Sequence, residues 1–438
     1  MRGKDYIWLL LLGVLVVLQA TPATARRDAE YDRFKQLVTI IEQVKRNYAS
    51  EVSEDTLFLG AYKGVVAELD PYSQYMTPDD VQQLMVDTEG EFGGLGIEIT
   101  LDENRILKVI TPLEDTPAMK AGVLPGDRII EIDGKSTYRM TILDAVKVLR
   151  GKPGTSVVIT VVSESRKARQ RITVTRDIIK VKSVRAAKMV DEKAKVGYVR
   201  MSNFQKDTAE ELDRAVKGLL DDGMRALVLD LRRNPGGLLD SAVKVSDRFL
   251  DEGTIVSTKG RADASKRVFS ATKAATYPHF PLAVLVSNYS ASASEIVAGA
   301  VQDTGRGILV GDRTFGKGSV QSILPLDGGA RLRLTTAKYY TPSGRCIHRG
   351  VDAKPEDPWG IQPDIVVETD VEDQIGLLKH WQQERIVVNN KNNGEHKDTP
   401  PSAPAKKGAE DEEAKPFVDR PLERAVDALK AILVYRKG

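Results

Sequence analysis

The chain has 438 residues, of which 41% are hydrophobic, and this is enough to build two or more globular domains. Its 64 basic and 62 acidic residues leave a net charge of +2. No basic stripe with interleaved aromatic residues is present, so the composition gives no case for a nucleic-acid partner. Cys346 is the only cysteine, which excludes an intrachain disulfide.

Residues 1–25 have the pattern of a secretory signal peptide. A positively charged start is followed by an apolar run from Ile7 to Leu18, and Ala23-Thr24-Ala25 offers the small residues of a cleavage site. Because the run is short for a membrane span, we expect cleavage and export to the bacterial periplasm. An uncleaved anchor in the inner membrane is the alternative.

Residues 26–89 are predicted to form an N-terminal helical region. Apolar side chains recur at helical spacing between Phe34 and Val44, and a second helix is expected over residues 56–69. This helix is expected to end at Asp70-Pro71, because a residue before proline is disfavoured in the helical conformation.

Residues 90–176 contain a glycine-rich loop, an alternating strand and a helix in succession. The loop reads G-E-F-G-G-L-G-I-E-I from Gly90 to Ile99, and the strand follows T-P-A-M-K-A-G-V-L-P-G-D. The spacing G-x-G-x-x-G is absent, which argues against a dinucleotide-binding loop. This region resembles a PDZ domain, inserted between the N-terminal helices and the rest of the chain.

The glycine-rich loop can expose successive backbone N–H groups that bind a carboxylate. Beside the loop, an edge strand can pair with a peptide. The predicted peptide-binding residues are Phe92, Gly93, Gly94, Leu95, Gly96, Ile97 and Ile99. Val146 or Leu149 on the following helix is expected to complete an apolar pocket. A structural spacer with a degenerate groove is the alternative.

From residue 177 to residue 388, strands alternate with helices, which predicts an α/β layer with βαβ crossovers. Strands are expected at residues 196–200, 226–231, 282–287 and 331–340, and helices at residues 208–220, 238–250 and 295–302.

The motif with the most specific chemistry reads S-N-Y-S-A-S-A-S-E-I-V-A-G-A-V-Q-D and is followed by T-F-G-K-G-S-V-Q. Ser290, Ser292 and Ser294 lie where a strand is expected to turn into a helix. A hydroxyl there would be exposed beside free N–H groups that can stabilise an oxyanion. Lys317 lies between two glycines, where close approach of backbone and burial are expected to lower its pKa. Residues four apart on a strand share a face, so Gln321 could reach Lys317.

These two segments resemble the carboxyl-terminal processing peptidases, also called tail-specific proteases. The resemblance implies that Ser292 is the nucleophile, that Lys317 is the general base and that Gln321 orients the lysine. The upstream L-R-R-N-P-G-G implies that the backbone N–H groups of Gly237 and Ala293 form the oxyanion hole. The residues alone leave open whether Gly236 or Gly237 points towards the site.

The same resemblance extends to L-D-P-Y-S-Q-Y-M-T-P at Leu69–Pro78, which connects the N-terminal helices to the PDZ module in this family. It implies a Clp-protease and crotonase-like α/β catalytic core with an inserted PDZ domain and flanking helices, α+β overall. The implied activity is that of an exported serine endopeptidase that cleaves protein substrates near their C-termini. Its partners would be proteins or peptides with free C-termini.

Other functions remain open from the sequence. A Ser-His-Asp triad would need one of the four histidines, none of which lies in a recognisable catalytic context: His279, His348, His380 and His396. A non-catalytic PDZ scaffold that only binds peptides is one alternative. A crotonase-like acyl-transfer enzyme is another, although export would separate it from cytosolic acyl-CoA. No metal or cofactor is implied, because no His/Cys/Asp cluster has ligand spacing.

Residues 389–416 are rich in Asn, Pro, Lys and Glu and too poor in apolar residues to fold alone, so they are predicted to be a disordered linker. An amphipathic helix is expected over residues 417–438, with Leu422, Leu429 and Leu433 on its apolar face. That face could dock on its own domain or pair with a second subunit. The dimers of the resembled family favour the second, which predicts a homo-oligomer.

Overall fold

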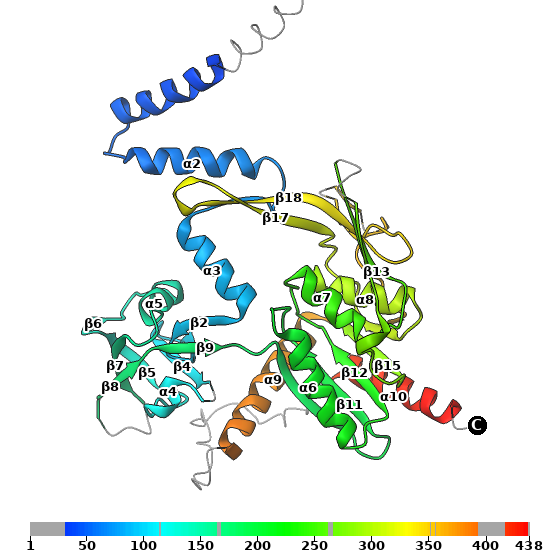
Figure 1. The fold of residues 1–438 in the computed structure, drawn as a ribbon. Coiled ribbons are helices and arrows are strands. Elements are labelled where there is room, and N and C mark those ends of the chain that lie inside the picture. Colours follow the sequence, from blue (N-terminus) through cyan, green and yellow to red (C-terminus); the bar gives the residue numbers. More distant parts are fainter. Residues whose placement is uncertain are drawn as a thin grey trace, which may run out of the picture. The chain divides into compact units, whose positions relative to one another are not determined.

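The computed structural model describes residues 31–113, 115–163, 168–261, 266–350, 352–354, 356–392 and 417–436 (Figure 1). The chain divides into two compact units, one of residues 1–77 with 322–335 and one of residues 78–321 with 336–438. The predicted signal peptide and residues 393–416 of the predicted linker lie outside the described residues. Among the described residues, no helix combines the length and the apolar character that a membrane crossing requires.

The first unit contains both predicted N-terminal helices. One covers residues 31–47 in the described chain, and α2 spans Glu54–Ala67. A turn follows, in which the Asp70 carboxylate accepts the N–H groups of Tyr72 and Ser73 and the hydroxyl of Thr335. The turn leads into β1 (Gln74–Met76), which pairs antiparallel with β18 (Arg331–Tyr340). β17 (Ser319–Pro325) also pairs with β18.

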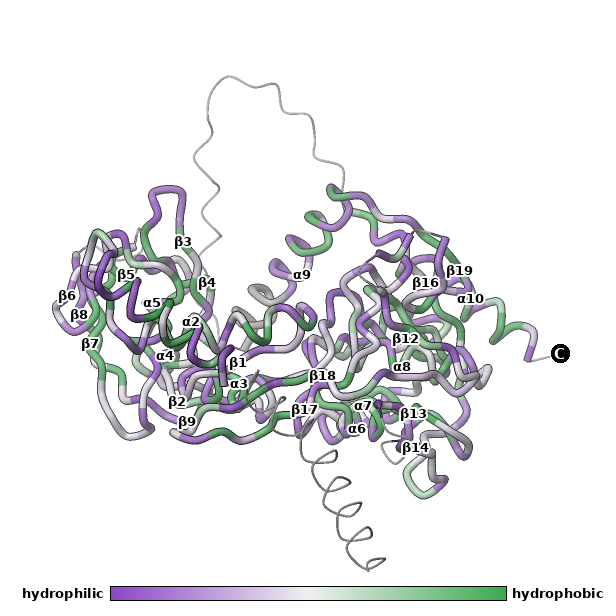
Figure 2. Tube along the Cα trace, turned by 90° about the horizontal axis from the view of Figure 1, so that it is seen from above, coloured by the Kyte–Doolittle hydropathy of each residue, from purple (hydrophilic) through white to green (hydrophobic). Residues whose placement is uncertain are grey.

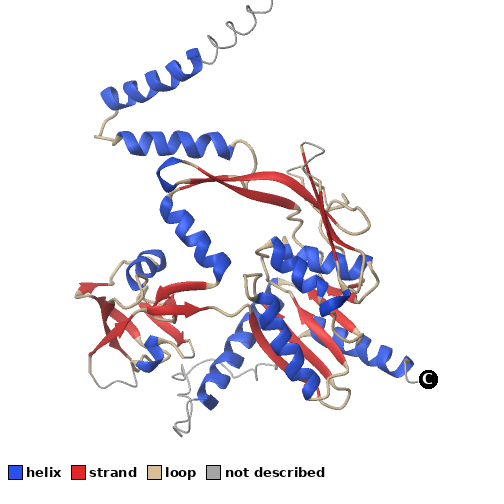
Figure 3. Cartoon of the chain, viewed as in Figure 1, coloured by secondary structure: helices blue, strands red, loops and turns tan. Residues whose placement is uncertain are grey.

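The second unit begins with α3 (Pro78–Glu89), which lies within the predicted helical region of residues 26–89 although its bounds were not predicted, and continues into the predicted PDZ region. A sheet in the order β3-β4-β5-β7-β8 surrounds a core that includes Leu107, Ile129 and Ile159 (Figure 3). Its elements are β2 (Glu91–Gly94), β3 (Ile97–Leu101), β4 (Leu107–Pro112), α4 (Pro117–Lys120), β5 (Arg128–Ile132), β6 (Lys135–Ser136), α5 (Ile142–Leu149), β7 (Ser156–Val162), β8 (Gln170–Thr175) and β9 (Asp177–Lys180).

The rest of this unit is a sheet in the order β10-β11-β12-β15-β16-β19, with hydrophobic residues along its central strands (Figure 2). β10 is antiparallel to β11, and the other pairs are parallel, as the predicted βαβ crossovers require. The strands are β10 (Val184–Asp191), β11 (Val196–Met201), β12 (Ala226–Asp230), β15 (Leu282–Val286), β16 (Ile308–Gly311) and β19 (Ile365–Val366).

One face of this sheet packs against α6, α7 and α8 through a large apolar cluster that includes Val199, Leu229 and Val284. These helices span Thr208–Asp221, Leu239–Asp247 and Ala293–Asp303, within a few residues of the predicted bounds. Outside this layer, β13 (Thr254–Gly260) pairs with β14 (Arg267–Ser270) and with β18. Two short 3-10 helices lie at Lys273–Ala275 and Asp327–Gly329.

The other face of the sheet is covered by α10 (Arg420–Tyr435), the predicted amphipathic helix. Ala425, Leu429 and Leu433 are buried against strands that include Tyr198 and Leu285. The apolar face therefore docks on its own domain, and the preference for a second subunit as its partner is wrong for this face. α9 (Val371–Asn392) precedes it and includes residues 389–392, which had been predicted as the start of the linker.

Candidate active site

Ser292 occupies a sharp turn between a buried strand and a helix. β15 ends at Val286, and α8 begins at Ala293, directly after the serine. Ser292 has φ of 55° and ψ of −113°, a left-handed conformation that costs a non-glycine residue about 1–3 kcal/mol. Its side chain is only 7% exposed. Such strain persists only where the surrounding structure fixes it, and here it places the hydroxyl at the N-terminus of the helix.

The two neighbouring serines have structural partners. The Ser290 hydroxyl donates to the Leu231 carbonyl (2.8 Å) and accepts the Ser287 N–H (2.9 Å). The Ser294 hydroxyl donates to the Asn234 carbonyl (2.9 Å). Both side chains therefore fasten the Ser292 turn to the segment that follows β12.

Two backbone N–H groups beside Ser292 have no acceptor among the described residues. One belongs to Ala293, the first residue of α8, and the other to Gly237. The Gly236 N–H instead donates to the Asn234 side chain (3.0 Å). A Cβ on Gly236 would lie 2.8 Å from the Ser292 Cβ and 2.9 Å from the Ala293 nitrogen, so this turn lies directly against the start of α8. The geometry supports Gly237, rather than Gly236, as the available donor.

Glu295 connects the Ser292 turn to the Lys317 segment. It is fully buried, and one carboxylate oxygen accepts the N–H groups of Ser292 and Lys317 (both 2.8 Å). The other oxygen accepts the Thr314 hydroxyl (2.6 Å) and the Gly316 N–H (2.7 Å). Burial raises the pKa of Glu295, and the four hydrogen bonds oppose that rise. From the sequence, Glu295 is a plausible structural partner with no chemical role, and a glutamate three residues after Ser292 fits the N-terminal turn of a helix.

Lys317 lies in an irregular segment that ends where β17 begins at Ser319. The prediction that Lys317 and Gln321 share one face of a strand is therefore wrong, because Lys317 lies before the strand begins. Its flanking glycines permit close packing, as expected, because a Cβ on Gly318 would lie 2.5 Å from the His348 nitrogen. The Gln321 side-chain amide donates to the Ser319 hydroxyl (2.9 Å), within the strand.

Tyr339, which the sequence analysis missed, lies on β18 beside the segment that carries Lys317. It is 5% exposed, and its backbone N–H donates to the Gly318 carbonyl (2.8 Å). Burial raises the pKa of Tyr339 to about 12. No local pattern could have found this contact, because Tyr339 is an ordinary residue of the alternating strand β18.

The predicted peptide groove lies beside β3, an edge strand that pairs with β4 on one side. α5 lies against β3, and its Leu149 is buried. Within the described chain, the N–H groups of Leu95 and Gly96 have no acceptor. The preceding part of the predicted loop is instead the strand β2, which pairs with β9. Phe92, Gly93 and Gly94 thus shape the loop, and Leu95 and Gly96 supply its available donors.

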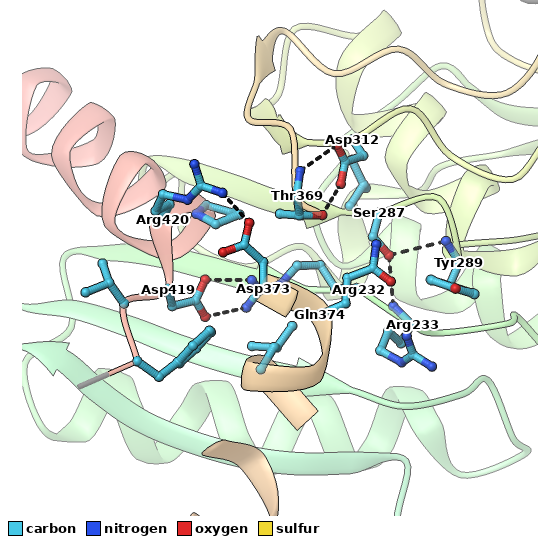
Figure 4. A pocket seen from close by; sticks show the side chains of 15 residues that line it. Arg232, Arg233, Ser287, Tyr289, Asp312, Thr369, Asp373, Gln374, Asp419 and Arg420 are labelled. Atoms are coloured by element: carbon cyan, nitrogen blue, oxygen red, sulfur yellow. Dashed lines mark hydrogen bonds and ion pairs between the residues drawn. The ribbon is translucent and has the colours of Figure 1, made fainter. Parts of the chain in front are cut away.

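Figure 4 shows a pocket elsewhere in the second unit, lined by residues that include Arg232, Asp312, Asp373 and Asp419. Arg232 is buried and donates to both Asp230 and Asp419 (each 2.7 Å at the shortest). Its charge is therefore already compensated, and none of Ser292, Lys317 and Gln321 lines the pocket. We assign no chemistry to it.

Comparison with known proteins identifies a peptidase domain and a PDZ domain in this chain. Residues 195–367 match peptidase family S41, residues 108–163 match a PDZ domain, and residues 16–80 match the N-terminal domain of the activating protease CtpB. A carboxy-terminal-processing protease of Bartonella bacilliformis is 42% identical, with the alignment covering 81% of this chain and 79% of that protein. A carboxyl-terminal-processing protease of Synechocystis is 35% identical over 82% of this chain and 86% of that protein. The carboxy-terminal processing protease CtpB of Bacillus subtilis is 33% identical over 85% and 75%, respectively.

Proposed function

Because the chain belongs to the carboxy-terminal processing protease family of serine-type peptidases, we propose that it is an exported endopeptidase that cleaves proteins near their C-termini with a Ser-Lys dyad. One observation carries the proposal. Ser292 is held in a strained conformation at the start of α8, beside backbone N–H groups of Gly237 and Ala293 that have no acceptor in the described chain.

In the proposed reaction, the Ser292 oxygen attacks the scissile carbonyl while neutral Lys317 takes the serine proton. The N–H groups of Gly237 and Ala293 stabilise the negative charge that develops on the carbonyl oxygen. Lys317 then delivers the proton to the leaving amine, and a water molecule hydrolyses the acyl-enzyme by the same route. Gln321 orients the lysine.

The PDZ region supplies the selection of chain ends in this proposal. The N–H groups of Leu95 and Gly96 bind the free carboxylate, and the last residues of the substrate pair with the open edge of β3 beside Ile97 and Ile99. A bound tail raises the local concentration of the cleavage site near Ser292.

A fluorophosphonate probe tests the nucleophile, because it reacts only with an activated serine. We expect stoichiometric labelling of the wild-type protein, with fragmentation of the labelled peptide placing the adduct on Ser292. Ser292→Ala should not be labelled, and its digest of a model substrate should contain no new C-termini. Binding of peptides without labelling would favour the PDZ scaffold, and release of CoA from a thioester would favour the acyl-transfer enzyme.

Export rests on the sequence of residues 1–25. We expect the full chain, expressed in a Gram-negative host, to appear in the periplasmic fraction with a new N-terminus near Arg26. A chain lacking residues 2–25 should stay in the cytoplasm. Recovery of the intact N-terminus in the inner-membrane fraction would instead show a retained anchor.

A further inference from the structure

Arg233 and Tyr289 form a stacked pair on two neighbouring turns. The guanidinium carbon of Arg233 lies 4.3 Å from the centroid of the Tyr289 ring. The Ser287 hydroxyl accepts the backbone N–H groups of both residues (3.2 Å and 3.3 Å), so the two turns are joined at this point (Figure 4). Tyr289 is 46% exposed and Arg233 is half-buried, so solvent reaches both residues.

The charge of Arg233 has no acidic partner in the described part of the chain. Arg232 and Arg420, which line the same pocket, each have one. Arg232 pairs with Asp419, and Arg420 pairs with Asp373. Among the described residues, no carboxylate lies within ion-pair distance of Arg233. Stacking covers a face of the guanidinium, and its N–H donors point outwards in its plane, so they are available to a carboxylate.

Arg233 also has a backbone conformation that an arginine side chain disfavours. Its φ is 56°, in the left-handed region, where glycine and asparagine are favoured and most other residues are rare. The Asn234 N–H donates to the Leu231 carbonyl (3.2 Å) and closes the turn. An asparagine at position 233 would fit this turn with less strain. Such strain is concentrated at functional sites, and the turn alone does not require an arginine here.

The pair lies on the two segments that lead to the proposed catalytic groups. The Asn234 carbonyl accepts the Ala291 N–H (3.0 Å), and a Cβ on Gly236 would lie 2.8 Å from the Ser292 Cβ. The segments therefore run side by side. Tyr289 precedes Ser292 by three residues, a chain length of at most about 10 Å. An extended peptide advances about 3.3 Å per residue, so substrate residues about two to four positions from the scissile bond come within reach of the pair.

We propose that Arg233 is a specificity-determining residue, whose guanidinium binds an acidic side chain of the substrate about two to four residues from the scissile bond. This inference rests on the proposed function and narrows its substrates. Tyr289 holds the guanidinium by stacking on it, and the carboxylate binds the N–H donors at its edge. The catalytic groups are the same for every substrate, and acidic substrates are favoured among them.

Paired peptides measure this preference directly. A model peptide whose cleavage site has been mapped is made with Glu or with Gln at each of the positions near the scissile bond, on both sides, and with the same C-terminus throughout. We expect kcat/KM to be about fivefold higher for Glu than for Gln at one or two of these positions, the size of a partly exposed ion pair. The ratio should approach unity in about 1 M salt, which screens such a pair.

Arg233→Asn tests whether Arg233 causes the preference. Asparagine accepts the left-handed conformation, so the thermal unfolding midpoint should stay the same or rise, while the Glu/Gln ratio falls to about unity. Arg139→Asn is the matched control, because Arg139 also has a left-handed φ (66°) and lies over the ring of Tyr138 (5.5 Å) in the PDZ region. This control should keep the wild-type ratio, and an equal fall in it would contradict the inference.

Charge reversal covers the case in which Arg233→Asn fails to fold. Arg233→Glu should cleave a peptide with Lys at the same position faster than the peptide with Gln. A damaged fold does not produce such a reversed preference, and its absence in a folded Arg233→Glu would count against the inference.

The outcomes separate the two proposals. Wild-type protein that neither cleaves the peptides nor is labelled at Ser292 overturns the proposed function itself. Wild-type protein that cleaves the Glu and Gln peptides equally fast at every position overturns only the role of Arg233. A folded Arg233→Asn that keeps the wild-type ratio also overturns that role, because another residue then binds the acidic side chain.

Discussion

Two pairs of backbone N–H groups, each without an acceptor in the described part of the chain, form the two anion sites that we propose for this protein. Gly237 and Ala293 flank Ser292, whereas Leu95 and Gly96 stand at the start of the PDZ groove. The donors are chemically identical. In the proposed function, the first pair lies beside the nucleophile and binds a charge that exists only during the reaction, and the second binds the carboxylate that every chain end carries.

The structure around the Gly237 and Ala293 donors also differs from that around the Leu95 and Gly96 donors. The N–H groups of Gly237 and Ala293 lie beside a buried turn, in which Glu295 accepts the N–H groups of Ser292 and Lys317 (both 2.8 Å). The PDZ pair borders the open edge of β3, where a substrate can enter and leave. Donors whose positions are fixed by buried hydrogen bonds favour binding of a transition state. Donors beside the open edge of a strand favour reversible binding of a ground-state ligand.

The largest expected effect is a loss of proteolysis that leaves peptide binding by the PDZ region unchanged. Ser292→Ala and Lys317→Ala should each lower proteolysis by about four orders of magnitude or more, and the double variant should be no worse, because the two groups act as one unit. Affinity for a C-terminal peptide, measured by fluorescence polarisation, should stay at the wild-type value in all three. Retained turnover in Lys317→Ala would assign the base to another residue.

The second-largest expected effect tests whether the hydrogen bonds of Glu295 hold the Ser292 turn in place. Glu295→Gln places an amide N–H2 where backbone donors need an acceptor, so we expect proteolysis to fall about a hundredfold. The free energy of unfolding should fall by about 1–3 kcal/mol, the cost of leaving buried donors unpaired. Glu423→Gln, in the exposed first turn of α10, is the control and should change neither quantity. Full activity in Glu295→Gln would mean that the turn keeps its geometry without the carboxylate.

A smaller expected effect tests whether the PDZ groove recognises a free C-terminal carboxylate. Two peptides that differ only in a free C-terminal carboxylate or a C-terminal amide should be cut at rates that differ about tenfold, with the amide slower. Gly94→Asp places a like charge beside the PDZ donors and should remove the difference. Equal rates for the two peptides in the wild-type protein would show that this groove does not read chain ends.

The smallest effect is a pH dependence of stability. The pKa of Glu295 is raised above its usual value of 4.5, so the folded state takes up this proton at a higher pH than the unfolded state does. Between the two pKa values, the stability contributed by Glu295 therefore increases as the pH falls. The difference in unfolding free energy between wild type and Glu295→Gln, measured by urea titration, should shift in favour of wild type on acidification. A shift in the opposite direction would contradict the raised pKa.

Local patterns predicted the elements that carry the site. The strand at Arg331–Tyr340 has the predicted bounds, and the strand–helix junction at Ser292 lies where apolar runs change period. Lys317 was placed on a strand in error, because Gly316 has φ of 87° and interrupts the extended chain. The bounds of α3 were not predicted within the helical region, although Pro78 at its first position and Asp79 and Asp80 in its first turn are helix-start signals.

Local sequence patterns could not predict the contacts that form between distant segments in the tertiary fold. The four donors of Glu295 join the start of α8 to the segment at residues 314–317, and these two segments meet only in the folded domain. Nothing in the spacing of residues along one strand encodes its partner across the core. The choice between Gly236 and Gly237 was open for the same reason, since it depends on the side chain of Asn234.

The buried pair of Arg232 with Asp419 has a consequence for the order in which the proposed site is completed as the chain folds. Arg232 begins the turn that supplies Gly237, and Asp419 lies 187 residues further along the chain. Without Asp419 the buried guanidinium keeps only Asp230 as a partner and leaves N–H groups unpaired, so the turn reaches its final stability only after Asp419 has docked. The proposed oxyanion site is therefore completed only once Asp419, at the start of α10, has docked. Late completion of this kind delays proteolysis until the whole core can fold.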